Sequence, residues 1–316
     1  MPLITDEVIT EPSGRTGGKG PEGRRLETLC RPSEEMALGC PRFYLGASRL
    51  VYAVLSSRAR GLSLGVNLNP DQYCNFDCCY CEVSRQAARK AAGPAAVNAQ
   101  AVAAELTEAL SEVNDGVLLR HAPFAALSKE NLRLAHVAIS GDGEPTLCAN
   151  FSEAMECIVH LRAAGIAPYF KMVLLTNGTA FEQPGVRAGL KLFTRSDEIW
   201  VKLDAGTQAG LERINRTAVP FERILRNITE LGRLRPIVIQ SMFVEVDGVL
   251  PERSELLEYS RRLLQLKQSG VQISVVQVYS ATRPHHTKMC RHLSLRVLSD
   301  VAGAVHQMTG LRVEVF

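Results

Sequence analysis

The chain has 316 residues, of which 46% are apolar, so it can bury one sizeable core in a single α/β domain or divide into two domains. Its formal charge of +3 is nearly balanced and argues neither for nor against a nucleic-acid partner. The chain has nine cysteines, an odd number with three crowded together, which indicates a reducing compartment. It lacks a signal-peptide pattern and an apolar run of about 20 residues, which predicts a soluble cytoplasmic protein with no membrane partner.

The first 45 residues are predicted to be a flexible N-terminal segment, and residues 46–316 a core domain with a C-terminal extension. Residues 11–25 hold five glycines and two prolines, a composition typical of flexible chain. Cys30 and Cys40 follow, and with Cys290 they could contribute to an auxiliary metal cluster. No C-x2-C pair supports such a cluster, so any role of these three cysteines stays open.

The most informative stretch is C-N-F-D-C-C-Y-C at residues 74–81, which follows an apolar run. Cys74, Cys78 and Cys81 form a C-x3-C-x2-C triplet, and thiolates this crowded indicate a soft metal centre. A zinc ribbon would need a second ligand pair, and a cubic four-iron cluster normally takes four cysteines. Three thiolates leave one iron open to a ligand that is not protein. Cys79 does not fit the spacing and is interpreted as a bystander.

Downstream of the cysteines, predicted strands and helices alternate along the chain. Helices are expected near residues 98–112, 151–164, 184–193, 221–233, 252–267 and 292–308, and strands at 136–140, 171–176, 198–204, 236–246 and 271–279, with a further edge strand at 311–316. The strands are nearly continuous apolar runs, which are typical of a parallel sheet covered by helices. In parallel barrels the chemistry lies where strands end, so polar motifs are expected there.

Two glycine-containing motifs follow the predicted strands at 136–140 and 171–176. The first is S-G-D-G-E-P-T-L at residues 140–147, whose glycines permit a close approach between backbone and ligand. The second is T-N-G-T at residues 176–179. The alternative interpretation is a pair of ordinary turns, the first of which begins a helix.

The strand at 198–204 is unusual because it carries charges. Alternation along a strand places Trp200, Lys202 and Asp204 on one face. A lysine and an aspartate that point into a barrel need a partner or a ligand, since burying them unpaired is unfavourable. The alternatives are a mutual salt bridge, or capping of the next helix by Asp204 or Thr207.

A basic loop follows the predicted strand at 271–279. Its residues Arg283, His285, His286 and Lys288, together with neighbouring basic residues up to 292, could bind a phosphate or a carboxylate of a substrate. The alternative is a solvated basic loop, and a metal site is improbable because no carboxylates accompany the adjacent histidines.

The cysteine triplet, with the aromatic Tyr80 just before its last cysteine, resembles that of the radical S-adenosylmethionine (radical SAM) superfamily. The segment from residue 49 into the cysteine loop, R-I-N-R-T at 213–217 and Arg283-Pro284 further resemble the wyosine-synthesis-like group of iron-sulfur oxidoreductases related to tRNA-modifying enzymes. The chain departs from that group at several positions. Arg58-Ala59-Arg60-Gly61 stands where the group has an arginine pair, and Thr217 replaces a proline.

The resemblance implies a partial (βα)6 TIM-like barrel of radical SAM type, with a 4Fe-4S cluster on the three cysteines and SAM on the open iron. Tyr80 would lie against the adenine, and Gly141, Asp142, Gly143 and Glu144, which resemble the G-G-E-P motif of the family, would hold the methionine end. The resemblance makes Asn177, Lys202 and Asp204 further SAM contacts. It also implies an electron donor such as flavodoxin or ferredoxin.

The resemblance implies an enzyme that reductively cleaves SAM to a 5'-deoxyadenosyl radical and modifies a substrate. An RNA nucleoside is the leading substrate class, and a peptide, a protein or a small metabolite is the alternative. A protein of another class, an iron-sulfur carrier that transfers electrons or senses redox state without cleaving SAM, would not need the glycine motif at residues 140–147.

Overall fold

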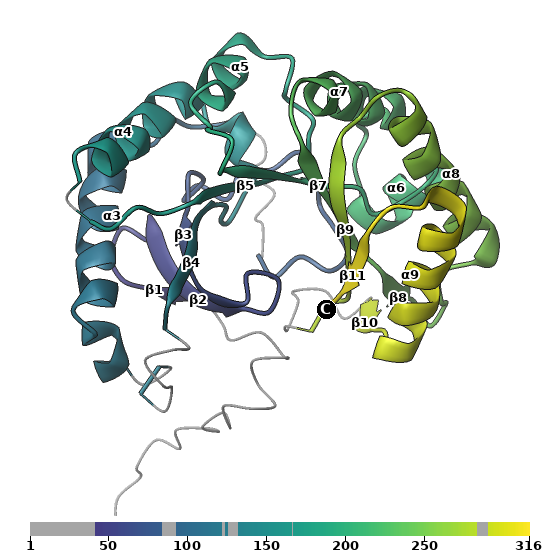
Figure 1. The fold of residues 1–316 in the computed structure, drawn as a ribbon, viewed down its shortest axis with the longest axis horizontal. Helices are drawn as coiled ribbons and strands as arrows, with labels where there is room; N and C mark the ends of the chain where they lie inside the picture. Colours follow the sequence, from purple (N-terminus) through teal and green to yellow (C-terminus); the bar gives the residue numbers. More distant parts are fainter. Residues whose placement is uncertain (1–41, 84–92, 122–123, 126–131, 166, 283–289) are drawn as a thin grey trace, which may run out of the picture. The chain divides into compact units, whose positions relative to one another are not determined.

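The structure, a computed structural model, describes residues 42–83, 93–121, 124–125, 132–165, 167–282 and 290–316, all of which belong to one compact unit. They form a curved sheet with helices along its outer side (Figure 1). In spatial order its strands are β1 (Phe43–Tyr44), β2 (Val51–Ser56), β3 (Gly61–Val66), β4 (Leu134–Ile139), β5 (Met172–Thr176), β6 (Glu198–Lys202), β7 (Ile237–Met242), β9 (Ile273–Tyr279) and β11 (Val313–Val315). A second, small sheet pairs β8 (Val244–Val246) with β10 (Cys290–His292).

Strands β3, β4, β5, β6, β7 and β9 pair in parallel, in chain order, and β11 adds a parallel edge strand beside β9. Strands β1 and β2 pair antiparallel at the other edge. The six parallel strands with their outer helices are the predicted partial (βα)6 barrel, and the predicted edge strand at the C-terminus is present. The sheet order does not close into a ring, so β1 and β11 are its edges.

The helices are α3 (Ala99–Asn114), α4 (Phe151–Ala163), α5 (Pro184–Leu190), α6 (Gln208–Asn215), α7 (Phe221–Leu234), α8 (Arg253–Gln268) and α9 (Leu295–Thr309), with 3-10 turns η1 (Val117–Arg120) and η2 (Pro145–Leu147). Their local sequence explains where they begin. Asn98 caps α3 by accepting a hydrogen bond from the backbone N–H of Ala101, and Ser294 caps α9 in the same way. In α7, buried apolar residues recur at helical spacing and face the sheet.

Two segments differ from the sequence-based expectation. The predicted strand at 236–246 divides at Phe243, whose N–H donates to Tyr279 O, and its second part leaves the main sheet to pair with β10. The run of apolar residues through this point carries no turn signal, so the break was not predictable. Helix α6 was expected only in the alternative in which Asp204 or Thr207 caps a following helix, because its eight residues are too few to display a clear period.

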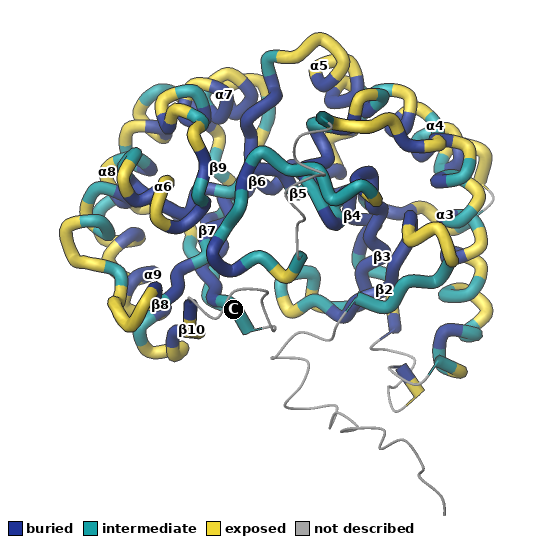
Figure 2. Tube along the Cα trace, turned by 180° about the vertical axis from the view of Figure 1, so that it is seen from behind, coloured by how far each residue is buried: buried dark blue, intermediate teal, exposed yellow. Residues whose placement is uncertain are grey.

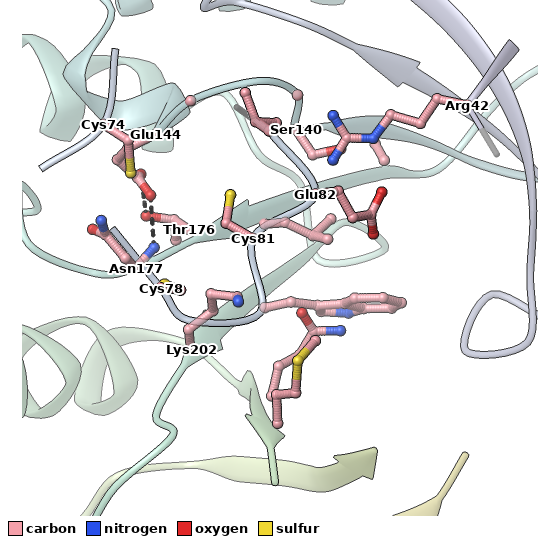
Figure 3. Close-up of a pocket in the computed structure, with 18 of the residues that line it drawn as sticks. Arg42, Cys74, Cys78, Cys81, Glu82, Ser140, Glu144, Thr176, Asn177 and Lys202 are labelled. Atoms are coloured by element: carbon pink, nitrogen blue, oxygen red, sulfur yellow. Dashed lines mark hydrogen bonds between the residues drawn. The ribbon is translucent and has the colours of Figure 1, made fainter. Parts of the chain in front are cut away.

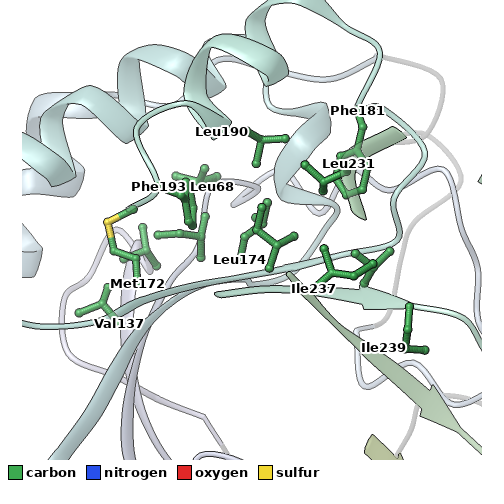
Figure 4. Close-up of a cluster of buried hydrophobic side chains, with 14 of the residues drawn as sticks. Leu68, Val137, Met172, Leu174, Phe181, Leu190, Phe193, Leu231, Ile237 and Ile239 are labelled. Atoms are coloured by element: carbon green, nitrogen blue, oxygen red, sulfur yellow. The ribbon is translucent and has the colours of Figure 1, made fainter. Parts of the chain in front are cut away.

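The core lies between the outer face of the sheet and the helices. Side chains from alternate strand positions, such as Val137, Met172 and Leu174, pack there against helix residues such as Leu190 and Leu231 (Figure 4). The strands are buried and the outward sides of the helices are exposed (Figure 2). The other alternate positions face the inside of the curved sheet, and these carry the polar residues described below.

No helix in the described part of the chain combines the length and the apolar character that crossing a membrane requires.

Candidate active site

A single pocket, here called the central pocket, joins the inner face of the curved sheet to the cysteine loop. Cys74, Cys78 and Cys81 all line it, together with side chains from the carboxyl ends of β4, β5 and β6 (Figure 3). The three cysteines are partly exposed, and none forms a disulfide with another described cysteine. The structure therefore brings the cysteine triplet and the strand-end motifs to one site, where catalytic residues of parallel barrels collect.

Backbone hydrogen bonds hold the cysteine loop against the end of α6. The N–H of Asp77 donates to Asn215 O (2.9 Å), and the N–H of Cys79 donates to Ile214 O (2.8 Å). Within the loop, the N–H of Cys81 donates to Cys78 O (3.0 Å). The R-I-N segment noted in the sequence is thus a support for the loop.

Side-chain hydrogen bonds tie the same loop to the end of β5. Asn75 Nδ2 donates to Thr179 Oγ1 (2.9 Å), and Asn177 Nδ2 donates to Asn75 Oδ1 (2.8 Å). Thr217 Oγ1 also donates to Asn75 O (3.0 Å). Asn75 was missed by the sequence reasoning, because its partners lie about a hundred or more positions away in the chain.

Cys79 lies apart from the central pocket. It is fully buried in a small apolar cluster with Cys290, whose thiol donates to Cys79 O (3.3 Å). Burial raises the pKa of the Cys79 thiol well above its usual value, and Cys290 raises it further. This placement agrees with the interpretation of Cys79 as a bystander, whereas Cys30 and Cys40 lie outside the described residues.

The donor set fits an iron-sulfur cluster better than a single metal ion. Within the described ranges no three His, Cys, Asp or Glu side chains converge on one ion position. A cubic cluster does not need such convergence, because each of its cysteines binds a different iron atom. Cys78 also accepts a hydrogen bond from Asn215 Nδ2 (3.3 Å), the kind of contact that tunes cluster sulfurs.

The glycine motif allows two loops to touch. A Cβ on Gly143 would lie 2.0 Å from Tyr73 O, and one on Gly141 would lie 2.2 Å from Asn67 Oδ1, so neither position accommodates a side chain. The next N–H, that of Glu144, donates to Tyr73 O (3.0 Å). The loop after β4 therefore lies directly against the residue before Cys74.

Glu144 is buried and faces the central pocket, where hydrogen bonds fix its carboxylate. Oε1 accepts from the N–H (3.1 Å) and the hydroxyl (2.6 Å) of Thr146 and from the Thr176 hydroxyl (2.6 Å), and Oε2 accepts from Asn177 N–H (2.8 Å). Burial raises the pKa of Glu144, and these hydrogen bonds offset part of the rise. Thr176, which the sequence reasoning did not single out, immediately precedes the T-N-G-T asparagine.

Asp142 is also buried but does not line the central pocket. Its carboxylate accepts hydrogen bonds from Arg42 (2.9 Å), from the Tyr44 hydroxyl (2.9 Å) and from Asn67 Nδ2 (3.1 Å). Asp142 thus fixes strand β1 and the end of β3 to the glycine motif, and the backbone around it faces the pocket.

Lys202 and Asp204 are linked through Tyr80. Lys202 Nζ donates to the Tyr80 hydroxyl (2.7 Å), and that hydroxyl donates to Asp204 Oδ2. Asp204 further accepts from Asn215 Nδ2 (2.8 Å) and from Met242 N–H (2.8 Å). Burial raises the pKa of Tyr80 well above its usual value, and Asp204 adds to the rise, so the phenol keeps its proton. Tyr80 and Lys202 line the central pocket, and Asp204 supports them from behind.

The capping alternative holds for Thr207, whose side chain accepts from Gly210 N–H (3.0 Å) at the start of α6. The predicted substrate residues Arg283, His285, His286 and Lys288 lie outside the described residues. Arg291, which is described, is exposed on β10 and lies 3.8 Å from Glu245 in an ion pair.

Comparison with known proteins relates the chain to one family. A family model described as "Radical SAM superfamily" matches residues 68–259, more than half of the chain. The "UPF0026 protein" of Helicobacter pylori (strain ATCC 700392 / 26695) is 26% identical over 232 residues, which cover 72% of this chain and 66% of that protein. The chain thus spans slightly less than two thirds of this relative's length.

A solved structure shows the same fold. A radical SAM methyltransferase from Sphaerobacter thermophilus superposes with a TM-score of 0.55 at 14% identity, over 84% of this chain and 68% of that one. A structure of TYW1 with a lysine-pyruvate adduct bound gives a TM-score of 0.48 at 17% identity, over 79% of this chain and 74% of that one.

Proposed function

Because the chain belongs to the radical SAM superfamily, whose enzymes use a 4Fe-4S cluster, SAM and an electron donor, we propose that it reductively cleaves SAM in the central pocket and modifies a substrate bound there. One observation carries the proposal: the three cysteines share a pocket with the glycine motif, Glu144, Asn177 and Lys202. When bound, the reduced cluster supplies the electron that splits SAM into methionine and a 5'-deoxyadenosyl radical.

The residues of the pocket have distinct tasks in this proposal. The thiolates of Cys74, Cys78 and Cys81 hold the cluster. The backbone from Gly141 to Glu144 receives the methionine end of SAM, because the glycines let this backbone pack directly against the residues before Cys74 at the pocket wall, where the Glu144 carboxylate is fixed.

Three further residues face the same space. Tyr80, Asn177 and Lys202 line the pocket; Tyr80 would lie against the adenine, and Asn177 and Lys202 would be polar contacts for SAM. Asp204 acts through Tyr80, and Asp142 acts by anchoring the backbone of the motif, so neither needs to touch SAM.

The reductant is an electron donor protein such as flavodoxin or ferredoxin. The substrate class implied by the resemblance, an RNA nucleoside, stays a prediction, and most of the basic loop that could bind its phosphate lies outside the described residues. The alternatives of a peptide, a protein or a small metabolite stay open with it.

The proposal is tested on anaerobically reconstituted protein reduced with dithionite. We expect formation of 5'-deoxyadenosine from SAM, slowly even without substrate. Replacing Cys74, Cys78 or Cys81 by alanine should lower this rate by more than about 100-fold, beyond the usual effect of losing an outer-shell partner of a metal, and should abolish the charge-transfer absorbance of the cluster.

Cys79→Ala is the matched control, because this thiol is adjacent to a ligand but buried away from the pocket, and it should retain the cluster and the rate. Reduced wild-type protein that carries a cluster yet forms no deoxyadenosine would instead support an iron-sulfur carrier without SAM cleavage. Retention of the cluster in Cys78→Ala, with loss in Cys79→Ala, would contradict the ligand assignment.

A further inference from the structure

Arg58 lies in the hairpin between β2 and β3 and lines the central pocket. Its guanidinium stacks on the ring of Tyr279 at the end of β9, with 4.2 Å between Cζ and the ring centroid. The neighbouring Arg60 forms an ion pair with Glu314 of β11 (3.4 Å). The hairpin therefore meets the opposite end of the open sheet and brings Arg58 into the space that the sheet encloses.

The other cations that line the central pocket already have partners. Arg42 donates to Asp142 (2.9 Å), and Lys202 donates to the Tyr80 hydroxyl, which is bound to Asp204. For Arg58, in contrast, the described residues provide a stacked ring and no acidic partner in an ion pair. A guanidinium stacked on a ring keeps the N–H donors at its edge available. The stacking therefore orients Arg58 but does not occupy its hydrogen-bond donors.

The acidic residues that line the pocket are occupied elsewhere. Four hydrogen bonds fix Glu144 beside the cysteines. Glu82 lies near Arg42 (Figure 3). Burial lowers the pKa of the Arg42 guanidinium, but Tyr52 and then Glu82 raise it, and the pKa ends above its usual value. Arg58 is thus a half-buried cation at the wall of the central pocket, stacked on Tyr279 and without an ion-pair partner among the described residues.

The floor of the pocket near Arg58 is polar but uncharged. His136 and Trp200 lie there edge to face, with ring centroids 5.4 Å apart, and both also line a second pocket at the opposite end of the strands. His136 is buried, and its pKa is lowered to about 4, first by burial and then by Lys171, so it is neutral at pH 7. Gln240 is fully buried, and its Oε1 has no hydrogen-bond partner in the described chain, while Nε2 donates to Gln277 Oε1 (2.8 Å).

We propose that this floor binds the anionic group of the substrate, a carboxylate or a phosphate, with Arg58 as its bidentate partner and Gln240 as a neutral contact for an adjacent polar atom. The inference deepens the proposed function and rests on it, because it assigns a substrate class to the same pocket. Arg58 is then a specificity-determining residue that positions the substrate on the far side of the pocket floor from Glu144 and the methionine end of SAM.

The test uses the single tryptophan of the chain, Trp200, as a reporter at the floor. Reconstituted protein with bound SAM is titrated anaerobically with inorganic phosphate and, separately, with acetate at constant ionic strength, while tryptophan fluorescence is followed. We expect a saturable change with at least one anion. Arg58→Gln should raise the dissociation constant by about tenfold or more. Arg58→Lys keeps the charge but loses the bidentate geometry of the guanidinium, so its dissociation constant should lie between those of wild type and Arg58→Gln.

Arg60→Gln is the matched control, since it removes a cation from the same hairpin that is paired with Glu314, and it should bind anions like wild type. The stronger of the two anions identifies a phosphorylated or a carboxylated substrate. The proposal is overturned if neither anion gives a saturable response, or if Arg58→Gln binds like wild type while circular dichroism shows it folded.

A second titration, with SAM itself, separates the site of Arg58 from that of the cofactor. Should Arg58→Gln weaken SAM as much as it weakens phosphate or acetate, Arg58 belongs to the SAM carboxylate and the substrate assignment is wrong. Failure of wild-type protein to form deoxyadenosine would contradict the proposed function alone, because anion binding is read without turnover.

Discussion

The buried imidazole of His136 makes the stability of the protein depend on pH. Its pKa is lowered from 6.5 to about 4, by burial, then by Lys171 and Arg58, against an opposing effect of Glu198. The folded chain therefore binds fewer protons here than the unfolded chain, so this contribution is full above pH 6.5 and is lost as the pH falls toward 4. Between pH 7.5 and 5.5 the loss is about 1 kcal/mol. Urea unfolding of wild type and of His136→Asn, at matched cluster content, measures how far the free energy of unfolding decreases between pH 7.5 and 5.5. The decrease should be smaller in the variant, and equal decreases would assign the effect to other groups.

At this scale the sequence indicated the cysteines of the candidate site more directly than their neighbours. Cys74, Cys78 and Cys81 were singled out because their spacing is local and uncommon, and their role as cluster ligands stays a prediction. Asp142 was expected to contact SAM, yet its carboxylate faces Arg42 and Asn67. Neither partner is near Asp142 in the chain. A sequence motif therefore predicts that a residue lies at a strand end, but it does not predict the direction of its side chain.

Among the elements, the loop after β4 and the cysteine loop are tightly packed against each other. Gly143→Ala would place a methyl group 2.0 Å from Tyr73 O, so one loop must move. We expect the free energy of unfolding to fall by about 1–3 kcal/mol and the iron content after reconstitution to fall as well. Gly303→Ala in α9 is the control, because nothing lies within 4 Å of the added Cβ, and it should be neutral or stabilising by up to about 1 kcal/mol. Unchanged stability and iron content in Gly143→Ala would show that the loops pack more loosely.

The alternation of apolar runs with amphipathic helices was sufficient to predict five of the six parallel strands and most helices. The failures have a common physical cause, since they occur where tertiary contacts override local pattern. After Phe243 the chain leaves β9 and pairs with β10, and Cys290–His292 becomes a strand only because β8 lies beside it. The break in an otherwise apolar run depends on this partner, which lies 44 or more positions downstream and which periodicity does not record.

For the molecule as a whole, the short strand β11 protects an edge of the open sheet. It pairs in parallel with β9, and Phe316 N–H donates to Val278 O (3.0 Å). A chain that ends at Arg312 would lose this pairing and the partner of Arg60, and would expose β9. We expect a loss of roughly 2–4 kcal/mol in the free energy of unfolding from the lost hydrogen bonds and half-buried apolar surface. We also expect more aggregation on heating, because unpaired edges recruit other chains.

Removal of Phe316 alone is the control for this truncation, and it should retain most of the stability because β11 itself remains. Urea titration followed by circular dichroism measures the first effect, and light scattering measures the second. Equal midpoints for the truncated and full chains would mean that β11 does not stabilise the sheet edge.

The cysteine loop is hydrogen-bonded to α6, to β5 and to the loop after β4. These bonds affect how the cluster is inserted and replaced. All of them are made by protein groups alone, so the loop is a preformed receptacle. A disordered loop would lose about 1–2 kcal/mol of chain entropy per residue when the cluster is inserted, and that cost would weaken the binding of iron and sulfide. In this protein the loop loses that chain entropy when the chain folds and not when the cluster binds. We therefore expect that protein stripped of its cluster by oxygen takes up a new cluster without refolding, as long as its three thiols stay reduced.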